Sequence, residues 1–188
     1  MRILFRRKSV DVHPLRKTDI ALPKDEQFLQ AIVEHVQLTK QDFKHIQLIQ
    51  DILEEQAINI AKRHYKLIMD TQETKQIFNK FTTHERWIKL FTGYVQHMAK
   101  GNFDQKYIEN LRKIGEIHSK IELTDDWFIA SYMRFYEYIT PYVVEKYASN
   151  PQLLSNVLLS LNRIITLDTI LVLQAYREAN DYQLVDHL

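Results

Sequence analysis

The segment KYIENLRKIGEIHSKIEL (residues 106–123) decides the fold, because its apolar side chains recur at helical spacing. Intervals of four, three, four and three residues separate Tyr107, Leu111, Ile114, His118 and Ile121. That spacing is typical of the buried face of an α-helix. It also places the imidazole of His118 in a hydrophobic core, where its polar nitrogens need partners.

The composition favours long helices over a sheet. The chain has 188 residues, of which 45% are hydrophobic, and this is enough for one domain with its own core. Only three glycines and four prolines occur, whereas a β-sandwich or a βαβ array needs many turns. We therefore predict an all-α fold of seven to eight helices without strands.

Several classes of protein are excluded by the composition. The chain has no cysteine, which rules out disulfides, zinc fingers, thiolate haem ligation and cysteine nucleophiles. A formal net charge of +1 provides no general attraction for nucleic acid or anionic lipid. The longest apolar run, residues 164–175, contains Asp168 and is shorter than the roughly 20 residues that cross a membrane. We expect a cytoplasmic protein, or the cytoplasmic part of a larger one.

Helical periodicity divides the chain into segments. Residues 1–23 lack sustained periodicity and are expected to form a loosely ordered N-terminal arm. Helices are predicted at 23–36, 39–69 with a break near 50–51, around 77–78, 83–99, 104–121, 126–147 and 151–180. Pro141 is expected to kink the helix that contains it.

The last of these helices is apolar on far more than one stripe, with Leu161, Ile164, Ile165, Leu171 and Val172 spread around it. A helix that is apolar over more than half of its circumference must be buried on two sides. One side is expected to face the core of the domain, and the other is expected to face a partner.

His118 has two interpretations. Most isolated core histidines are satisfied by a neighbouring backbone or side-chain group. Alternatively, Nδ1–H donates to the carbonyl of Ile114 one turn back, and Nε2 binds a metal. A lone histidine does not make a zinc site, but it fits haem, because the porphyrin supplies four of the iron ligands. Gly115, in the same helix, is either a tolerated weak point or a place where a backbone or a flat ligand approaches closely.

Tyr65 is the second candidate, on an apolar stripe beside the small Ala61. A tyrosine in such a position is usually a core residue. In a haem pocket, its hydroxyl would instead donate a hydrogen bond to the bound gas. His64 is expected to be a core or boundary residue, and Trp87 and Phe91 are core aromatics unless haem is present.

The segment FDQKYIENLRKIGEIHSKIELTDDWFIASYMRFYEYI (103–139) resembles the sensor domain of globin-coupled sensors, particularly the haem-based aerotaxis transducers of bacilli. That family carries a histidine in an I-x-x-x-H-x-x-I/L setting, which here is His118, followed by an aromatic-rich helix that begins near Trp127. Upstream, INIAKRHYKLIMD (58–70) resembles the helix that supplies the family's distal tyrosine, and ERWIKLFTGYVQHM (85–98) resembles its distal E helix.

The resemblance implies a globin-like fold over residues 24–182, in the sensor-globin variant with an extra N-terminal helix. It implies haem b with His118 as the iron ligand and Tyr65 as the distal hydrogen-bond donor. The other pocket residues that it implies are Trp87, Leu90, Phe91, Ile114 and Trp127. The chain departs from the family pattern at Leu90, where the aerotaxis relative has a small hydroxyl residue, and at Phe128, where that relative has a tyrosine.

The function that the resemblance implies is reversible binding of O2, or of CO or NO, at ferrous haem, without enzymatic activity. The signal would pass through a homodimer formed by the helices at 126–147 and 151–180 to a chemotaxis output. Residues 183–188 would then be a C-terminal tail toward an output domain that this chain does not contain. Two alternatives stay open: a haem-globin enzyme of the nitric oxide dioxygenase or peroxidase-like type, and a haem-free globin-like interaction domain of a stress-signalling scaffold.

Overall fold

The computed structural model describes residues 16–20, 22, 29–100 and 103–185, and this part of the chain is helical without strands. The helices are α1 (Gln30–His35), α2 (Lys40–Gln47), α3 (Gln50–Asp70), α4 (Gln72–Phe81), α5 (His84–Ala99), α6 (Gln105–Lys120), α7 (Asp125–Tyr147) and α8 (Pro151–Val185). The prediction of seven to eight helices is confirmed for the described residues, and so is the break in the long second segment. The predicted helix start at Pro23 and most of the predicted arm lie outside the described residues.

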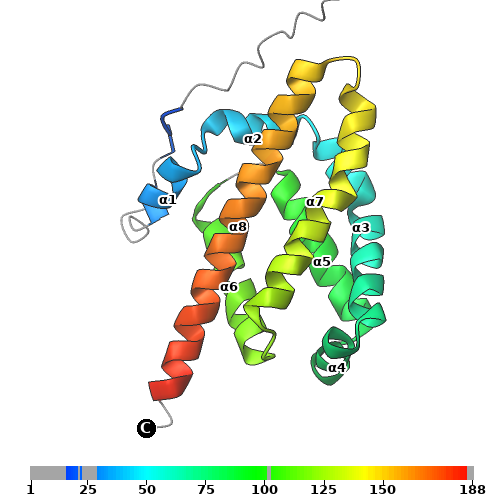
Figure 1. The fold of residues 1–188 in the computed structure, drawn as a ribbon, viewed down its shortest axis with the longest axis vertical. Coiled ribbons are helices and arrows are strands. Elements are labelled where there is room, and N and C mark those ends of the chain that lie inside the picture. The colour runs from blue at the N-terminus through cyan, green and yellow to red at the C-terminus, as the bar shows by residue number, and fades with distance from the viewer. Residues whose placement is uncertain (1–15, 21, 23–28, 101–102, 186–188) are drawn as a thin grey trace, which may run out of the picture.

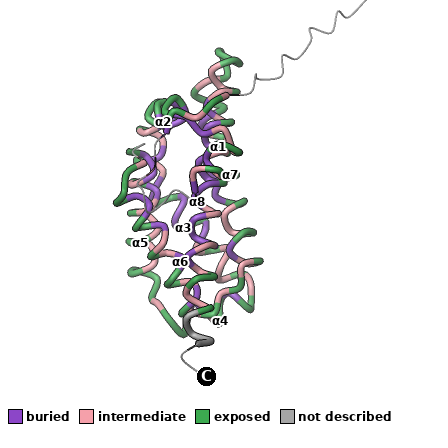
Figure 2. Tube along the Cα trace, turned by 90° about the vertical axis from the view of Figure 1, so that its left-hand side faces the viewer, coloured by how far each residue is buried: buried purple, intermediate pink, exposed green. Residues whose placement is uncertain are grey.

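Helix α8 is the centre of the fold. It packs against α6, α7 and α2, while α3 packs against α5 and α7. Figure 1 shows α7 and α8 as an antiparallel pair joined at one end of the molecule, with the short α4 at the opposite end. Buried positions line the inward sides of the helices (Figure 2), so the core runs along the length of the bundle.

The second apolar side of α8 is covered by the chain itself. Val157, Leu161, Leu167 and Leu171 are at most 1% exposed within one chain, because α2, α6 and α7 surround the helix. The expectation that a partner is needed to cover these residues is therefore wrong for most of the helix. Residues Pro151–Asp181 are long and apolar enough to cross a membrane, but 56% of the most apolar window is buried inside the fold. Its apolarity is that of a core helix, and the helix continues to Val185 rather than ending near residue 180.

Gly115 marks the place where α6 and α8 touch through their backbones. A Cβ atom at this position would lie 2.2 Å from the Val172 carbonyl oxygen and 2.9 Å from the Ala175 Cβ. Only a residue without a side chain fits this crossing. Of the two readings of Gly115, the close approach is confirmed, and what approaches is the backbone of α8.

Side-chain caps begin α5 and α6, and a left-handed turn follows α6, at the boundaries that the sequence predicts. The Thr83 hydroxyl accepts from the Arg86 N–H at 3.4 Å, and the Asp104 carboxylate accepts from the Tyr107 N–H at 2.9 Å. Helix α6 ends at Lys120, and Glu122, two residues later, has a left-handed backbone (φ 57°), after which the Leu123 N–H donates to the His118 carbonyl at 3.2 Å. This arrangement satisfies carbonyl groups at the helix end and closes α6 directly after His118.

Residues 16–20, within the predicted N-terminal arm, contact the domain through Arg16. Asp42 is fully buried, and its Oδ1 lies 3.2 Å from Nη1 of Arg16 and 3.2 Å from Nη1 of Arg163. Burial opposes ionisation of Asp42, but the hydrogen bonds from Ser160 and Thr39 and the charge of Arg16 lower its pKa overall. The buried carboxylate of Asp42 therefore links Arg16 to α2 and, through Arg163, to α8.

Candidate functional site

His118 lies in the last turn of α6 with its imidazole held in one orientation. Its Nδ1 is 2.7 Å from the carbonyl oxygen of Ile114, which can only accept, so Nδ1 carries the proton. In the neutral ring, Nε2 then carries the lone pair. Burial lowers the pKa of His118, and the bond to Ile114 opposes that effect only in part. The residue is thus a neutral imidazole whose Nε2 can bind a metal.

Phe128 of α7 covers the His118 ring on one side. The two rings meet edge to face with centroids 5.1 Å apart, and Phe128 in turn packs against Tyr132 at 4.8 Å. Phe128 is the position at which the aerotaxis relative has a tyrosine, so here the contact to His118 is apolar. Trp127, which was expected to line the pocket, directly precedes Phe128 in the chain, and its side chain is partly exposed.

A second imidazole, His64 of α3, lies in the same interior. Its side chain is 6% exposed and stacks on Phe91 with centroids 4.9 Å apart and on Trp87 at 5.6 Å. Burial, followed by the charge of His118, lowers the pKa of His64 to about 4. Burial thus disfavours the charged form of both His64 and His118. The core position of His64 is confirmed.

Tyr65 points to a different place from its neighbour His64. Its ring packs against His84 at 4.4 Å, Phe78 at 5.2 Å and Trp87 at 6.2 Å, between α3, α4 and α5. The structure therefore does not bring Tyr65 into contact with His118. The two neighbours diverge because successive residues of a helix point about 100° apart.

The remaining candidates separate into interior and surface residues. Trp87 and Phe91 stack on each other at 4.8 Å and join α5 to the His64 ring. Ile114 contributes its carbonyl, and its side chain is partly buried against the core. Leu90, expected to line the pocket, is 59% exposed, because it projects from the outer side of α5. The structure thus gathers Trp87, Phe91 and Ile114 around the two histidines and leaves Leu90 outside.

A buried carboxylate that the sequence analysis did not assign lies in the middle of α8. Asp168 is fully buried and accepts hydrogen bonds from the hydroxyls of Tyr107 on α6 and Tyr94 on α5, each at 2.8 Å. The Tyr132 hydroxyl on α7 donates to that of Tyr94 at 2.9 Å. Burial raises the pKa of Asp168 to about 7, although the tyrosine bonds act in the opposite direction. The only sequence signal for this cluster is an acid inside an apolar run.

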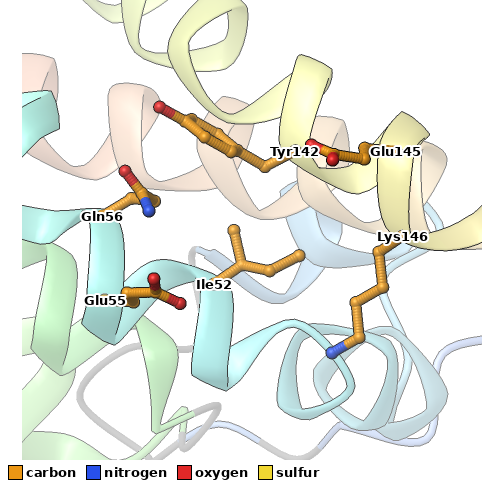
Figure 3. Close-up of a pocket in the computed structure, with 6 residues that line it drawn as sticks. All are labelled: Ile52, Glu55, Gln56, Tyr142, Glu145 and Lys146. Carbon is orange, nitrogen blue, oxygen red and sulfur yellow. The ribbon is translucent and has the colours of Figure 1, made fainter.

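An open pocket of about 230 Å³ lies elsewhere, between α3 and α7. Figure 3 shows that Ile52, Glu55 and Gln56 form one wall and that Tyr142, Glu145 and Lys146 form the other. Lys146 already bonds to Asp51 at 2.6 Å and to the Leu48 carbonyl at 3.0 Å. The pocket is open to solvent, and neither candidate histidine lines it.

The donor set around His118 fits haem better than a metal held by protein ligands alone. Among the described residues, no group of three or more His, Cys, Asp or Glu side chains could hold a metal ion. A single oriented imidazole in an aromatic interior suits a cofactor that brings most of its own ligands, as porphyrin does. The His64 Nδ1 is, in addition, a buried polar atom without a hydrogen-bond partner among the described residues. Such an atom suits a site that accepts a further group.

The chain belongs to the Protoglobin family, which matches residues 25–182. Its fold is similar to the globin domain of the Geobacter sulfurreducens globin-coupled sensor, with a TM-score of 0.73. That alignment covers 79% of this chain and 97% of the Geobacter domain at 17% sequence identity. At this identity the likeness shows a shared fold, and it confirms the globin-like architecture expected of the sensor-globin class.

Proposed function

We propose that this chain is a haem-based O2 sensor domain that holds haem b through Nε2 of His118. The observation that carries the proposal is the 2.7 Å bond from His118 Nδ1 to the Ile114 carbonyl, which fixes the tautomer with Nε2 free to bind. When bound, the haem would supply a ferrous iron that takes one diatomic gas molecule, O2 or alternatively CO or NO. Membership of the Protoglobin family supports the choice of cofactor.

The aromatic residues around His118 and His64 would hold and shield the cofactor. Phe128 restricts rotation of the imidazole from the α7 side, and Trp87 and Phe91 provide flat apolar faces from α5. An apolar surrounding excludes water and keeps both histidines neutral, which a metal-binding imidazole requires. Tyr65 is the proposed hydrogen-bond donor to the gas. That assignment rests on its position relative to His118 in the family pattern, since its ring lies against Phe78 and His84 in the structure.

The signal would leave through a homodimer of the α7–α8 face. Support comes from large apolar side chains that one chain leaves uncovered: Ile129, Met133 and Val144 of α7 are 49%, 60% and 41% exposed, and Leu159 of α8 is 37% exposed. A second copy of this face would bury them. Figure 1 shows the two helices side by side, so both can contribute to one interface. The proposed output is a chemotaxis protein or domain in the cytoplasm, and the proposed role is non-catalytic.

The deciding experiment is an absorption spectrum of protein produced with an ample supply of haem precursor. The wild-type chain should show a Soret band that is lost in His118→Ala and kept in the matched control His35→Ala, whose side chain is exposed on α1. A colourless wild-type protein would support the haem-free interaction domain instead. Retention of haem by His118→Ala would refute the ligand assignment, and sustained turnover of nitric oxide with a reductant would favour the enzyme.

A further inference from the structure

Asp168 and three tyrosines form a hydrogen-bonded cluster that joins four helices, and the proposed function so far gives this cluster no role. The Asp168 carboxylate on α8 accepts from the hydroxyls of Tyr94 on α5 and Tyr107 on α6, each at 2.8 Å. The Tyr132 hydroxyl on α7 donates to the Tyr94 hydroxyl at 2.9 Å. The carboxyl is fully buried, so its negative charge is costly unless these donors offset the cost.

Burial and hydrogen bonding act on the carboxyl of Asp168 in opposite directions. Burial raises its pKa, the bonds from Tyr107 and Tyr94 lower it, and the resulting pKa is about 7. Among the described residues, no cation acts on this carboxyl. The other titratable groups on the surrounding helices have contacts of their own: His97 of α5 stacks on the Tyr107 ring at 5.3 Å, and Asp42 and His45 of α2 bond to Ser160, about two turns before Asp168. Asp168 therefore changes between its neutral and charged forms near neutral pH.

The two protonation states of Asp168 require different hydrogen bonds. The three tyrosines keep their hydroxyl hydrogens, because burial and then the charge of Asp168 raise their pKa values. An ionised carboxylate only accepts, which suits the observed bonds, whereas a protonated carboxyl brings a fourth donor into the cluster. When this O–H donates to Tyr94, the Tyr94 hydroxyl has to donate to Tyr132, and the hydroxyl hydrogen of Tyr132 loses its acceptor. Protonation of Asp168 therefore changes the hydrogen bond of Tyr132.

Tyr132 belongs both to the cluster and to the packing around His118. The centroid of its ring lies 4.8 Å from that of Phe128, and the Phe128 ring lies 5.1 Å from the His118 imidazole. Phe128 is buried, so a shift of the Tyr132 ring has to be taken up by its neighbours in the core. A continuous series of contacts thus leads from the Asp168 carboxyl through Tyr94, Tyr132 and Phe128 to the proposed haem ligand.

We propose that Asp168 and its three tyrosines are a proton-binding site that is coupled to gas binding at the haem. This inference rests on the proposed function, since it needs haem on His118. Uptake of a proton by Asp168 changes how Tyr132 holds Phe128 against the His118 imidazole, and the gas affinity changes with it. The coupling is reciprocal, so gas binding changes the proton affinity of the cluster by the same factor. The domain would then respond to pH as well as to gas.

The first test measures the CO affinity of the full chain, loaded with haem and reduced, from about pH 6 to about pH 8. The wild-type affinity should change by about fivefold or more over this range, which is the lower end of typical couplings between sites. The midpoint of the change should lie near the pKa of Asp168, about 7.

Three variants connect this pH dependence to the cluster. Asp168→Asn carries an N–H donor where the protonated acid has its O–H, so it should show the low-pH affinity of the wild type at every pH. Tyr132→Phe keeps a ring against Phe128 but removes the hydroxyl, and its affinity should not vary with pH. Tyr136→Phe is the matched control, because Tyr136 is a partly buried tyrosine one turn further along α7, outside the cluster. It should keep the wild-type pH dependence.

A second readout follows the proton itself. In infrared spectra of the same proteins, the carbonyl stretch of the protonated Asp168 carboxyl should fade as pH rises through about 7. Tyr132→Phe should keep this titration, since Tyr94 and Tyr107 still bind the carboxyl, and Asp168→Asn should lack it.

The outcomes separate this inference from the proposed function. A haem-loaded wild type whose affinity is constant with pH would overturn the inference and leave haem binding by His118 intact. Wild-type pH dependence in Asp168→Asn or Tyr132→Phe would do the same, and so would the absence of the carboxyl titration in the wild type. A colourless wild type would overturn both.

Discussion

Replacing Gly115 by alanine is expected to destabilise the fold, although alanine is the better helix former. At an exposed position inside a helix, replacing glycine by alanine would raise the free energy of unfolding by about 1 kcal/mol. Here the new Cβ would lie 2.2 Å from the Val172 carbonyl oxygen, whereas carbon contacts are optimal near about 3.5 Å. The obstacle is backbone of α8, which no side-chain rotation can relieve. Overpacking of this kind costs typically about 3 kcal/mol at its upper end, so we expect a net loss of about 2 kcal/mol.

Gly93 supplies the matched control on α5. A Cβ added there meets nothing within 4 Å, so Gly93→Ala should raise stability by up to about 1 kcal/mol. The assay is urea unfolding followed by circular dichroism, with a thermal melt as a second measurement. At this chain length the loss in Gly115→Ala corresponds to a melting temperature lower by about 4–8 °C. If Gly115→Ala is as stable as the wild type, α6 and α8 do not touch through their backbones and the description of the core is wrong.

The remaining predictions concern the buried polar groups. The pKa of Asp168 is about 7 in the folded chain, against an ordinary value of 3.8. The folded state therefore binds the carboxyl proton of Asp168 more tightly than the unfolded state does. The contribution of Asp168 to stability accordingly falls as pH rises from about 4 to 7. The difference in unfolding free energy between Asp168→Asn and the wild type should therefore change over this range in urea titrations, and a difference that stays constant with pH would refute the raised pKa. In haem-free protein, His64→Phe should raise the unfolding free energy by about 1–3 kcal/mol, because it removes an unpartnered buried nitrogen, and a loss of stability would contradict this. Tyr65→Phe should accelerate O2 release by roughly tenfold in stopped-flow measurements if the hydroxyl donates to the gas, and an unchanged rate would remove Tyr65 from the mechanism.

Helix positions were predictable because the apolar side chains on the buried face of a helix recur every three or four residues. The stripe through Tyr107, Leu111 and Ile114 identified α6, and the caps at Thr83 and Asp104 identified where helices begin. The contact between His118 and the Ile114 carbonyl was predictable as well, since both residues belong to the same helix and lie one turn apart. Local geometry of this kind needs no knowledge of how helices pack.

The features that the sequence could not provide depend on packing between helices. His64 and Tyr65 are adjacent, and only the rotation of α3 about its axis determines that His64 is the more deeply buried of the two. The partners of Asp168 come from helices far apart in the chain, so its position in an apolar run shows that something unusual occurs but not what. The apolar circumference of α8 likewise indicated burial on two sides without showing that the same chain provides both.

The crossing at Gly115 also determines how displacement can travel. Close contact between the two backbones prevents α6 from moving nearer to α8, and the hydroxyl of Tyr107 on the Asp168 carboxylate resists its moving away. The contact at Val172 and the hydrogen bond to Asp168 lie about one helical turn apart on α8, so they hold α6 and this part of α8 together. Any displacement of α6 would therefore reach α8 through these two contacts.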